Sequence, residues 1–262
     1  MSRDFLDEFP GESAVGPMQR TQRGMRPALP KRFYKEARAV ERDGAFVLAL
    51  DGKPARTPAR NLLVVLDREL GEALAAEWNA LGEIVDPARM PLTRLVSVAI
   101  DRVAGEGDRI AADIANYAGS DLVFYRASEP EGLAAAQGAA WDPVLDWARD
   151  VLGARFVLSE GIRHVEQPEA SLAAVRAEIG KVERPFGLAA LATVTALTGS
   201  ALIALMLARG ALAPDQAWRA AHVDEDWNTR QWREDADAMQ RRAARRVEFD
   251  AAARVLALFR QA

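Results

Sequence analysis

The chain has 262 residues, 50% of them hydrophobic, with no cysteine, two histidines and a formal net charge of −4. A chain of this length can bury one large core or two smaller ones. The lack of cysteine excludes disulfides, thiolate zinc sites and cysteine nucleophiles. The net charge argues against nucleic acid as the main partner, because nucleic-acid-binding proteins usually carry an excess of clustered Lys and Arg.

The first 30 residues mix Gly, Pro, Arg and acidic residues without apolar periodicity. This composition predicts a flexible leader over residues 1–30, and its acidic residues fit neither a secretory signal nor an organellar transit peptide. From Phe33 onward, short apolar or alternating runs are separated by Asp43-Gly44 and Asp51-Gly52, which are hairpin-type dipeptides. We therefore expect a small antiparallel sheet.

Helical patterns follow this sheet. Asp67 is a candidate N-cap, and Leu70, Leu74, Trp78 and Leu81 recur on one helical face. A second helical segment is expected over residues 92–103. Beyond the glycines at 105 and 107 nearly all of the chain has helical periodicity, with short extended pieces at 122–127 and 154–158.

These patterns predict an α+β fold with two domains. A small N-terminal antiparallel-sheet domain with helices is expected over residues 31–105, and a mainly α-helical C-terminal domain over residues 106–262. Residues 188–208 are uncharged and just long enough to span a bilayer. Because they are rich in Ala and Thr and are interrupted at Gly199, we expect one buried helix, or two helices that meet at Gly199, and no membrane insertion.

Motifs for catalysis or cofactor binding are weak in this sequence. Neither His164 nor His222 has a recognisable nucleophile motif nearby. The glycines at 105 and 107 lack the spacing and the Lys-Ser/Thr pair of a phosphate-binding loop. The acidic run at 224–226 has no calcium-loop spacing and no histidine pair. We therefore expect no catalytic residue, no metal and no cofactor.

The stretch VDEDWNTRQW, residues 223–232, joins three consecutive acids to two tryptophans. On a helix that begins at Pro214, one stripe would contain Trp218, Ala221, His222, Glu225, Thr229, Trp232, Ala236 and Met239. A carboxylate on such a stripe is costly to bury without a partner. Glu225 therefore either pairs with an internal arginine, or is solvated, or belongs to a surface that binds another protein. Asp224, Asp226 and Trp227 would point elsewhere.

The basic residues that follow, Arg241, Arg242, Arg245 and Arg246, are expected to form the polar face of a late helix. Earlier in the chain, Asp142-Pro143 marks either a helix start or a kink inside a longer helix. Tryptophans at the spacing found there favour core packing over a binding function.

Several stretches together resemble a known family. They are KRFYKEA (31–37), DGKPARTPA (51–59), LAAEW (74–78), MPLTRL (90–95), the pattern YRA…P.GL…Q…WDP.LDW over 125–147, and the late acidic helix carrying Trp232. In order and spacing they resemble the assembly chaperones for the catalytic head of ATP synthase, of the type that binds the alpha subunit. The resemblance covers roughly residues 31–258.

The resemblance implies a protein that is not an enzyme and that holds the free alpha subunit until its beta partner arrives, without using ATP. It implies an N-terminal α+β domain, a helical C-terminal domain, a cytoplasmic location in bacteria and a mitochondrial matrix location for eukaryotic relatives. It assigns partner binding to Glu225, or to Asp224 or Asp226 if the match slips by one residue.

The partner-binding surface is therefore expected to contain Asp224, Glu225, Trp227, Trp232 and Glu234, on a protein that acts as a monomer. Two alternatives stay open. One is a carboxylate-dependent hydrolase that uses Glu225 with Asp226 or Glu234, and the other is an acidic scaffold module that binds basic proteins. Adjacent residues on a helix diverge by about 100 degrees, which disfavours a hydrolase built on two neighbouring acids.

Overall fold

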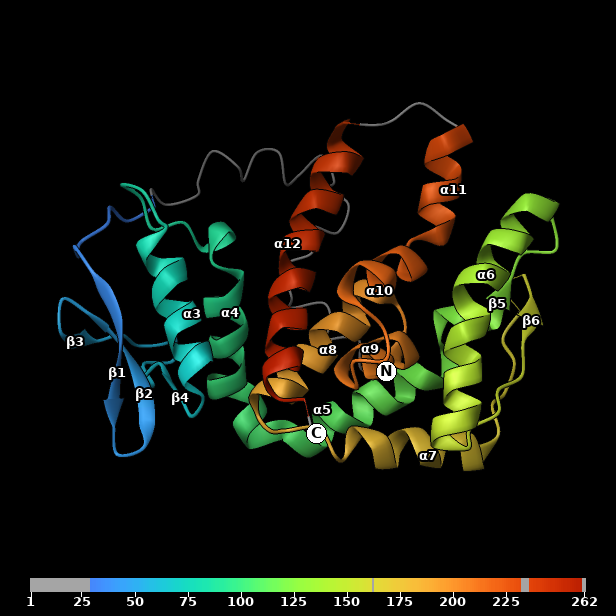
Figure 1. Ribbon diagram of the computed structural model, residues 1–262, viewed down its shortest axis with the longest axis horizontal. Coiled ribbons are helices and arrows are strands. Elements are labelled where there is room, and N and C mark those ends of the chain that lie inside the picture. The colour runs from blue at the N-terminus through green and yellow to red at the C-terminus, as the bar shows by residue number, and fades with distance from the viewer. Residues whose placement is uncertain (1–28, 162, 232–235, 261–262) are drawn as a thin grey trace. The chain divides into compact units, whose positions relative to one another are not determined.

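The structure is a computed structural model that describes residues 29–161, 163–231 and 236–260. The chain divides into two compact units between Arg102 and Val103, close to residue 105, where the sequence changes character. The expected leader lies outside the described residues up to residue 28. The predicted fold class is confirmed, because a small antiparallel sheet with helices is followed by a mainly helical region (Figure 1).

The N-terminal unit is built on two hairpins. Its elements are β1 (Ala37–Arg42), β2 (Ala45–Leu50), β3 (Lys53–Pro54), β4 (Val64–Val65), α3 (Arg68–Asn79), a 3₁₀ turn (Pro87–Arg89) and α4 (Pro91–Val98). β2 pairs with β1 on one side and with β3 and β4 on the other, always antiparallel. Asp43 and Gly44 have φ of 51° and 79°, and Asp51 and Gly52 have φ of 47° and 80°. Two consecutive positive φ values fit the type I′ turns that the dipeptides predict.

Helix α3 packs closely on the sheet. The carboxylate of Asp67 caps the helix by accepting a 2.8 Å hydrogen bond from the Leu70 amide, as predicted. A Cβ at Gly71 would lie 2.9 Å from the Cβ of Phe46 and 3.2 Å from that of Ala39. No residue larger than glycine therefore fits at this crossing without displacing the helix.

Glu77 and Trp78 join α3 to α4. The carboxylate of Glu77 accepts hydrogen bonds from the Leu92 and Thr93 amides, both at 2.8 Å, and from the Thr93 hydroxyl at 2.6 Å. The Trp78 indole N–H donates to the Thr93 hydroxyl oxygen at 2.9 Å. Trp78 is only half-buried, whereas Leu70 is fully buried. The predicted apolar face is therefore core at the leucines and becomes a polar junction at Trp78.

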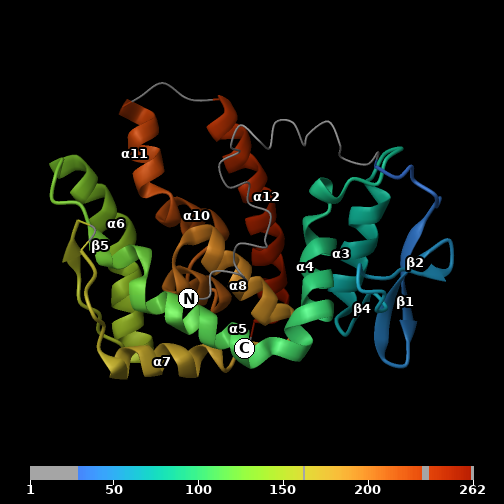
Figure 2. The same ribbon diagram turned by 180° about the vertical axis from the view of Figure 1, so that it is seen from behind.

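A π-helical turn over Ala99–Val103 leads into the C-terminal unit. The elements of this unit are α5 (Ala104–Tyr117), 3₁₀ turns at Ala118–Ser120 and Leu122–Phe124, β5 (Tyr125–Arg126), α6 (Glu131–Trp147), a π-helical turn (Ala148–Leu152), β6 (Ser159–Glu160), α7 (Glu169–Ile179), α8 (Phe186–Thr198), α9 (Ala201–Ala208), α10 (Pro214–Ala221), α11 (Val223–Gln231) and α12 (Ala236–Leu258). Figures 1 and 2 show α8 and α9 in the middle of this unit, with α12 and α6 on opposite sides of them.

The uncharged stretch 188–208 forms two buried helices. Of the two alternatives predicted from the sequence, the structure therefore has the pair of helices that meet at Gly199. α8 ends at Gly199, whose φ is +68°, and α9 begins after Ser200. Within the described residues, none of the helices combines the length and the apolar composition needed to cross a bilayer. The buried Asp121 carboxylate joins the 3₁₀ turn Leu122–Phe124 to α9, because it accepts hydrogen bonds from the Val123 amide at 3.3 Å and the Leu202 amide at 3.0 Å.

The extended pieces expected at 122–127 and 154–158 were largely wrong. Residues 122–124 form a 3₁₀ turn that Asp121 caps, and only Tyr125–Arg126 pairs as a strand, parallel to Ser159–Glu160. Residues 154–158 have no strand pairing. β-branched and aromatic residues suggested strands there, but contacts in the folded chain overrode this local preference.

Candidate partner-binding surface

The predicted helix from Pro214 does not run straight through the acidic stretch. α10 ends at Ala221, His222 has φ of −118° and ψ of 22°, and α11 begins at Val223. The His222 ring stacks on the Trp218 ring with centroids 3.9 Å apart, and its Nδ1–H donates to the Trp218 carbonyl at 2.8 Å. This local contact ends α10. The single continuous helical stripe predicted from Trp218 to Met239 was therefore wrong, because α10 and α11 are separate helices.

His222 lies at the junction of α10 and α11 and is only 2% exposed. Burial lowers the pKa of the imidazole, partly offset by the Trp218 carbonyl and the nearby Glu225 carboxylate. Its Nε2 has no hydrogen-bond partner within the described part of the chain and lies 3.9 Å from Glu225 Oε2. His222 is therefore a buried packing residue, whereas His164 is exposed.

Glu225 combines two of the alternatives left open by the sequence. Its side chain is 51% exposed, and its Oε1 lies 3.4 Å from Nη1 of Arg245 on α12. The glutamate is thus both half-solvated and paired with an internal arginine. Since exposed ion pairs contribute between about 0 and 1 kcal/mol to stability, this contact leaves Glu225 available to another cation.

The acids on either side of Glu225 point to different neighbours. Asp224 accepts a 2.7 Å hydrogen bond from the Gln137 side-chain amide on α6. Asp226 lies 2.5 Å from Arg242 Nη2 on α12. No two of the three carboxylates converge on one point, and the described residues include no group of three or more His, Asp or Glu suited to a metal ion. This divergence disfavours the hydrolase alternative, which needs two carboxylates on one substrate.

Trp227 packs against the start of α6. A Cβ at Gly132 would overlap Cη2 of Trp227, so the half-buried indole covers this glycine closely. The Gly-Leu of the 125–147 pattern is thereby explained, because a side chain at residue 132 would displace Trp227. Two further predicted partner-binding residues, Trp232 and Glu234, lie outside the described residues.

The arginines of α12 hold α10 and α11 rather than forming a free basic face. Arg245 donates to the Leu197 carbonyl at 2.8 Å in addition to its contact with Glu225. Arg246 pairs with Asp215 on α10 and with Asp250, and its guanidinium lies 5.4 Å from the Trp218 ring centroid. The expected polar face is present at these positions, and much of its charge is balanced by acidic residues of the same unit.

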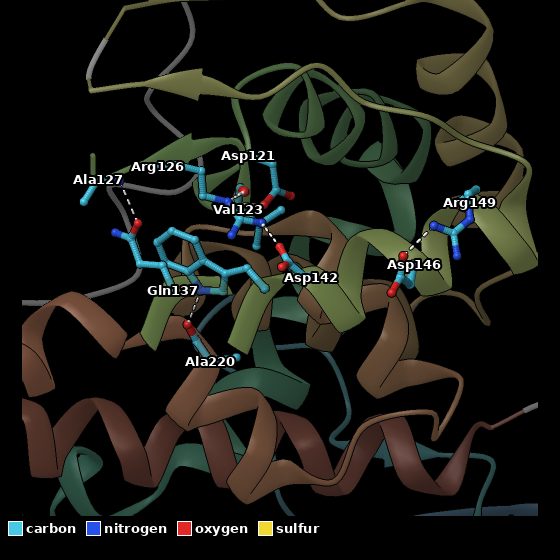
Figure 3. Close-up of polar contacts among 10 residues, drawn as sticks. Asp121, Val123, Arg126, Ala127, Gln137, Asp142, Asp146, Arg149 and Ala220 are labelled. Atoms are coloured by element: carbon cyan, nitrogen blue, oxygen red, sulfur yellow. Dashed lines mark hydrogen bonds and ion pairs between the residues drawn. The ribbon is translucent and has the colours of Figure 1, made fainter. Parts of the chain in front are cut away.

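A buried network places α10, and through it α11. Trp141 on α6 is fully buried, and its indole N–H donates to the Ala220 carbonyl at 2.7 Å (Figure 3). Arg126 lies over the Trp141 ring at 5.3 Å and pairs with Asp142 at 2.9 Å (Figure 3). Pro143 sits inside α6, which runs on to Trp147. Of the two readings of Asp142-Pro143, a helix start is therefore excluded.

Gln137 links the same network to the acidic helix. Its side-chain oxygen accepts from the Ala127 amide at 2.7 Å (Figure 3), and its nitrogen donates to Asp224 at 2.7 Å. The glutamine is part of the family pattern over 125–147, but its contact with Asp224 was not predicted from the sequence. Its signal was a polar side chain in the otherwise apolar segment 133–141, where only a partnered amide is tolerated in the interior.

The surface that results is a short acidic helix supported from two sides. None of the residues of α11 is buried, and its contacts reach α6 through Asp224 and Trp227 and reach α12 through Glu225 and Asp226. Figure 1 shows α11 extending beyond α10 between α6 and α12. The arrangement presents carboxylates on a fixed support, which suits contact with a protein surface carrying positive charge.

Comparison with known proteins agrees with this picture. The model of the ATP12 chaperone protein family matches residues 31–149. The structure resembles the crystal structure of the Atu1473 protein from Agrobacterium tumefaciens, with a TM-score of 0.85 and 48% identity over 94% of this chain and 92% of that one. It also resembles Atp12 from Paracoccus denitrificans, with a TM-score of 0.80 and 35% identity over 88% of this chain and 98% of that one.

A more distant relative is the mitochondrial protein atp12 of Schizosaccharomyces pombe. It is 24% identical over an alignment of 215 residues, and the match covers 77% of this chain and 73% of that protein. The resemblance found in the sequence is confirmed by these matches. The chain belongs to the ATP12 family of chaperones, which act in the assembly of ATP synthase.

Proposed function

We propose that this protein is an ATP-independent chaperone that holds the free alpha subunit of the ATP synthase catalytic head until it pairs with the beta subunit. It acts as a monomer in the bacterial cytoplasm, without catalysis and without a metal or nucleotide. Membership of the ATP12 family supports the chaperone activity. The choice of the alpha subunit rests on the resemblance of the sequence motifs.

One observation supports α11 as the surface that binds the subunit. The helix exposes an acidic side chain whose internal ion pair is weak, because Glu225 and Arg245 are 51% and 35% exposed and 3.4 Å apart. A basic side chain of the alpha subunit can replace Arg245 at a cost of about 1 kcal/mol or less. A chaperone must also release its client. Ion pairs that can change partner at a small cost in free energy favour moderate affinity over permanent binding.

The remaining predicted residues act around Glu225 in this proposal. Asp224 and Trp227 fix α11 against α6, so they hold the helix in place and also border the surface. Trp232 and Glu234 follow α11 in the chain, and their participation stays a prediction.

The proposal is tested by replacing Glu225 with glutamine. Glu225→Gln keeps size and removes charge, and the exposed ion pair it loses is worth less than about 1 kcal/mol. We expect melting close to that of the wild type, together with reduced suppression of alpha-subunit aggregation. Thermal unfolding and light scattering of the purified alpha subunit measure the two effects.

The matched control is Glu166→Gln, which changes an exposed glutamate in the segment before α7 and should leave both measurements unchanged. Asp226→Asn is less suitable, because Asp226 is half-buried and 2.5 Å from Arg242. If Glu225→Gln protects the alpha subunit as well as the wild type does, Glu225 is not part of the binding surface.

A pull-down from native extract tests the choice of client. Recovery of the alpha subunit at near-stoichiometric amounts is the expected result. Recovery of unrelated basic proteins without the alpha subunit would favour an acidic scaffold module instead.

A further inference from the structure

Strand β1 forms one edge of the sheet, and its hydrogen-bonding directions follow from its register. Arg42 pairs with Ala45 across the two-residue turn Asp43-Gly44. In an antiparallel hairpin of this kind the residues that flank the turn bond to each other, and the residues that bond to the partner strand then alternate. The even-numbered residues 38, 40 and 42 therefore bond to β2. The amides and carbonyls of 37, 39 and 41 point away from it.

Asn79 confirms this direction independently. Its side-chain oxygen accepts from the Ala37 amide at 2.8 Å, and its side-chain nitrogen donates to the Ala37 carbonyl at 2.8 Å. A primary amide presents an acceptor and a donor just as a peptide group does. The last residue of α3 thus occupies the first outward position of β1 in the way that a neighbouring strand would.

The next two outward positions have no such partner among the described residues. Ala39 and Glu41 are the non-bonded positions of the β1–β2 ladder, and their backbone groups make no other hydrogen bond to a described residue. Ala39 is partly exposed and Glu41 is exposed. Two amides and two carbonyls are therefore available along the outer edge of β1, which is the usual requirement for adding a strand from another chain.

The edge is also held rigid. The close packing of Gly71 on Ala39 and Phe46 fixes α3 against the middle of β1 and β2, and Asn79 fixes the far end of the strand. An extended segment that adds here meets an edge already in strand conformation, so little ordering of the chaperone opposes binding.

Side chains beside the edge indicate what such a segment contains. Arg38, Val40 and Arg42 lie on one face of β1 because side chains alternate along a strand. Val40 is half-buried, and Arg38 and Arg42 are exposed. The ion pair of Arg38 with Glu36, at 2.7 Å, is between side chains that are 71% and 53% exposed, so Arg38 can exchange its partner.

We propose that the outer edge of β1 binds an extended segment of the client protein as an added strand, paired with Ala39 and Glu41. The segment carries an apolar residue beside Val40 and acidic residues two positions to either side, beside Arg38 and Arg42. This inference rests on the proposed function, since the client is the alpha subunit. It assigns a second contact on the N-terminal unit, separate from α11.

The test compares Glu41→Pro with Glu41→Ala. Proline removes an outward amide without breaking the β1–β2 pairing, and an outward-facing edge position is where sheets accept proline. Both variants lose the exposed contact of Glu41 with Arg68, at 3.4 Å, so they differ only in the backbone. We expect Glu41→Pro to bind purified alpha subunit about tenfold more weakly than Glu41→Ala, since it blocks edge hydrogen bonds that each add modestly to affinity.

Hydrogen exchange on the wild-type protein gives a second readout that needs no variant. The Ala39 and Glu41 amides should exchange at least about tenfold more slowly when the alpha subunit is bound, because a bonded amide exchanges only when it opens. Equal affinity of the two variants, or unchanged exchange at both amides in the complex, would overturn the inference while leaving the chaperone function intact.

Two other outcomes also contradict it. Protection of these amides that grows with the concentration of the chaperone alone would mean that the edge pairs two copies of this chain. Failure of the wild type to bind the alpha subunit in any assay would overturn the proposed function together with this inference.

Discussion

Replacing Trp141 with phenylalanine tests whether the buried network sets the stability of the helical unit. Trp141 is fully buried, and its indole N–H donates to the Ala220 carbonyl at 2.7 Å. Phenylalanine leaves this carbonyl without that donor, at a cost of about 1–2 kcal/mol. The smaller ring also leaves a void, which costs about 1 kcal/mol for the three ring atoms removed. The expected loss in the free energy of unfolding is therefore about 2–3 kcal/mol.

The stacking of Arg126 survives in part, because phenylalanine still offers an aromatic face to the guanidinium. In a unit of this size the loss lowers the melting temperature by about 5–10 °C. Urea unfolding and thermal melting measure it, with Trp147→Phe as the matched control on the same helix. Trp147 is only half-buried, and its replacement should cost less than about 1 kcal/mol. Equal melting of Trp141→Phe and wild type would show that the hydrogen bond to α10 contributes nothing.

Two further predictions concern stability. Burial raises the pKa of Asp121 to about 6 from 3.8, although the Ser200 side chain and the Leu202 amide donate to its carboxylate. The folded state then binds more protons than the unfolded state between about pH 4 and 6, so up to about 3 kcal/mol of stability is lost as the pH rises through this window. Urea titrations should show this slope in the wild type and not in Asp121→Asn. Trp78→Arg removes the indole bond to Thr93 and part of a half-buried ring, which should cost about 2 kcal/mol in thermal unfolding; unchanged melting would contradict it.

Features encoded by neighbouring residues were predictable from the sequence. The turns at Asp43-Gly44 and Asp51-Gly52 and the N-cap at Asp67 depend on backbone conformations and hydrogen bonds within a few residues. The change of direction at Gly199 is equally local, because glycine adopts positive φ at little cost. These features together gave the antiparallel sheet, the first helix and the two central helices.

Features that depend on distant residues were not predictable. The end of α10 was also missed, although its cause is local: the His222 ring lies on the Trp218 ring, and helical periodicity extends a helix through both residues. The strand predicted near residue 122 does not form there. The Asp121 carboxylate instead accepts a hydrogen bond from the Leu202 amide, which is far along the chain. Glycine at 132 has no local reason either, since it makes room for Trp227.

The candidate site illustrates the same division. The acids at 224–226 and the arginines at 241–246 were visible in the sequence as two separate charged runs, and each suggested a surface of its own. In the folded unit Arg242 and Arg245 face Asp226 and Glu225, so much of the charge of the two runs is balanced internally. The negative charge that a partner can contact therefore depends on the exposure of each carboxylate and on its distance from its arginine, and not on composition alone. On both measures Glu225 is held more weakly than Asp226, because its pair is longer and more exposed, and a competing cation would displace Arg245 before it displaced Arg242.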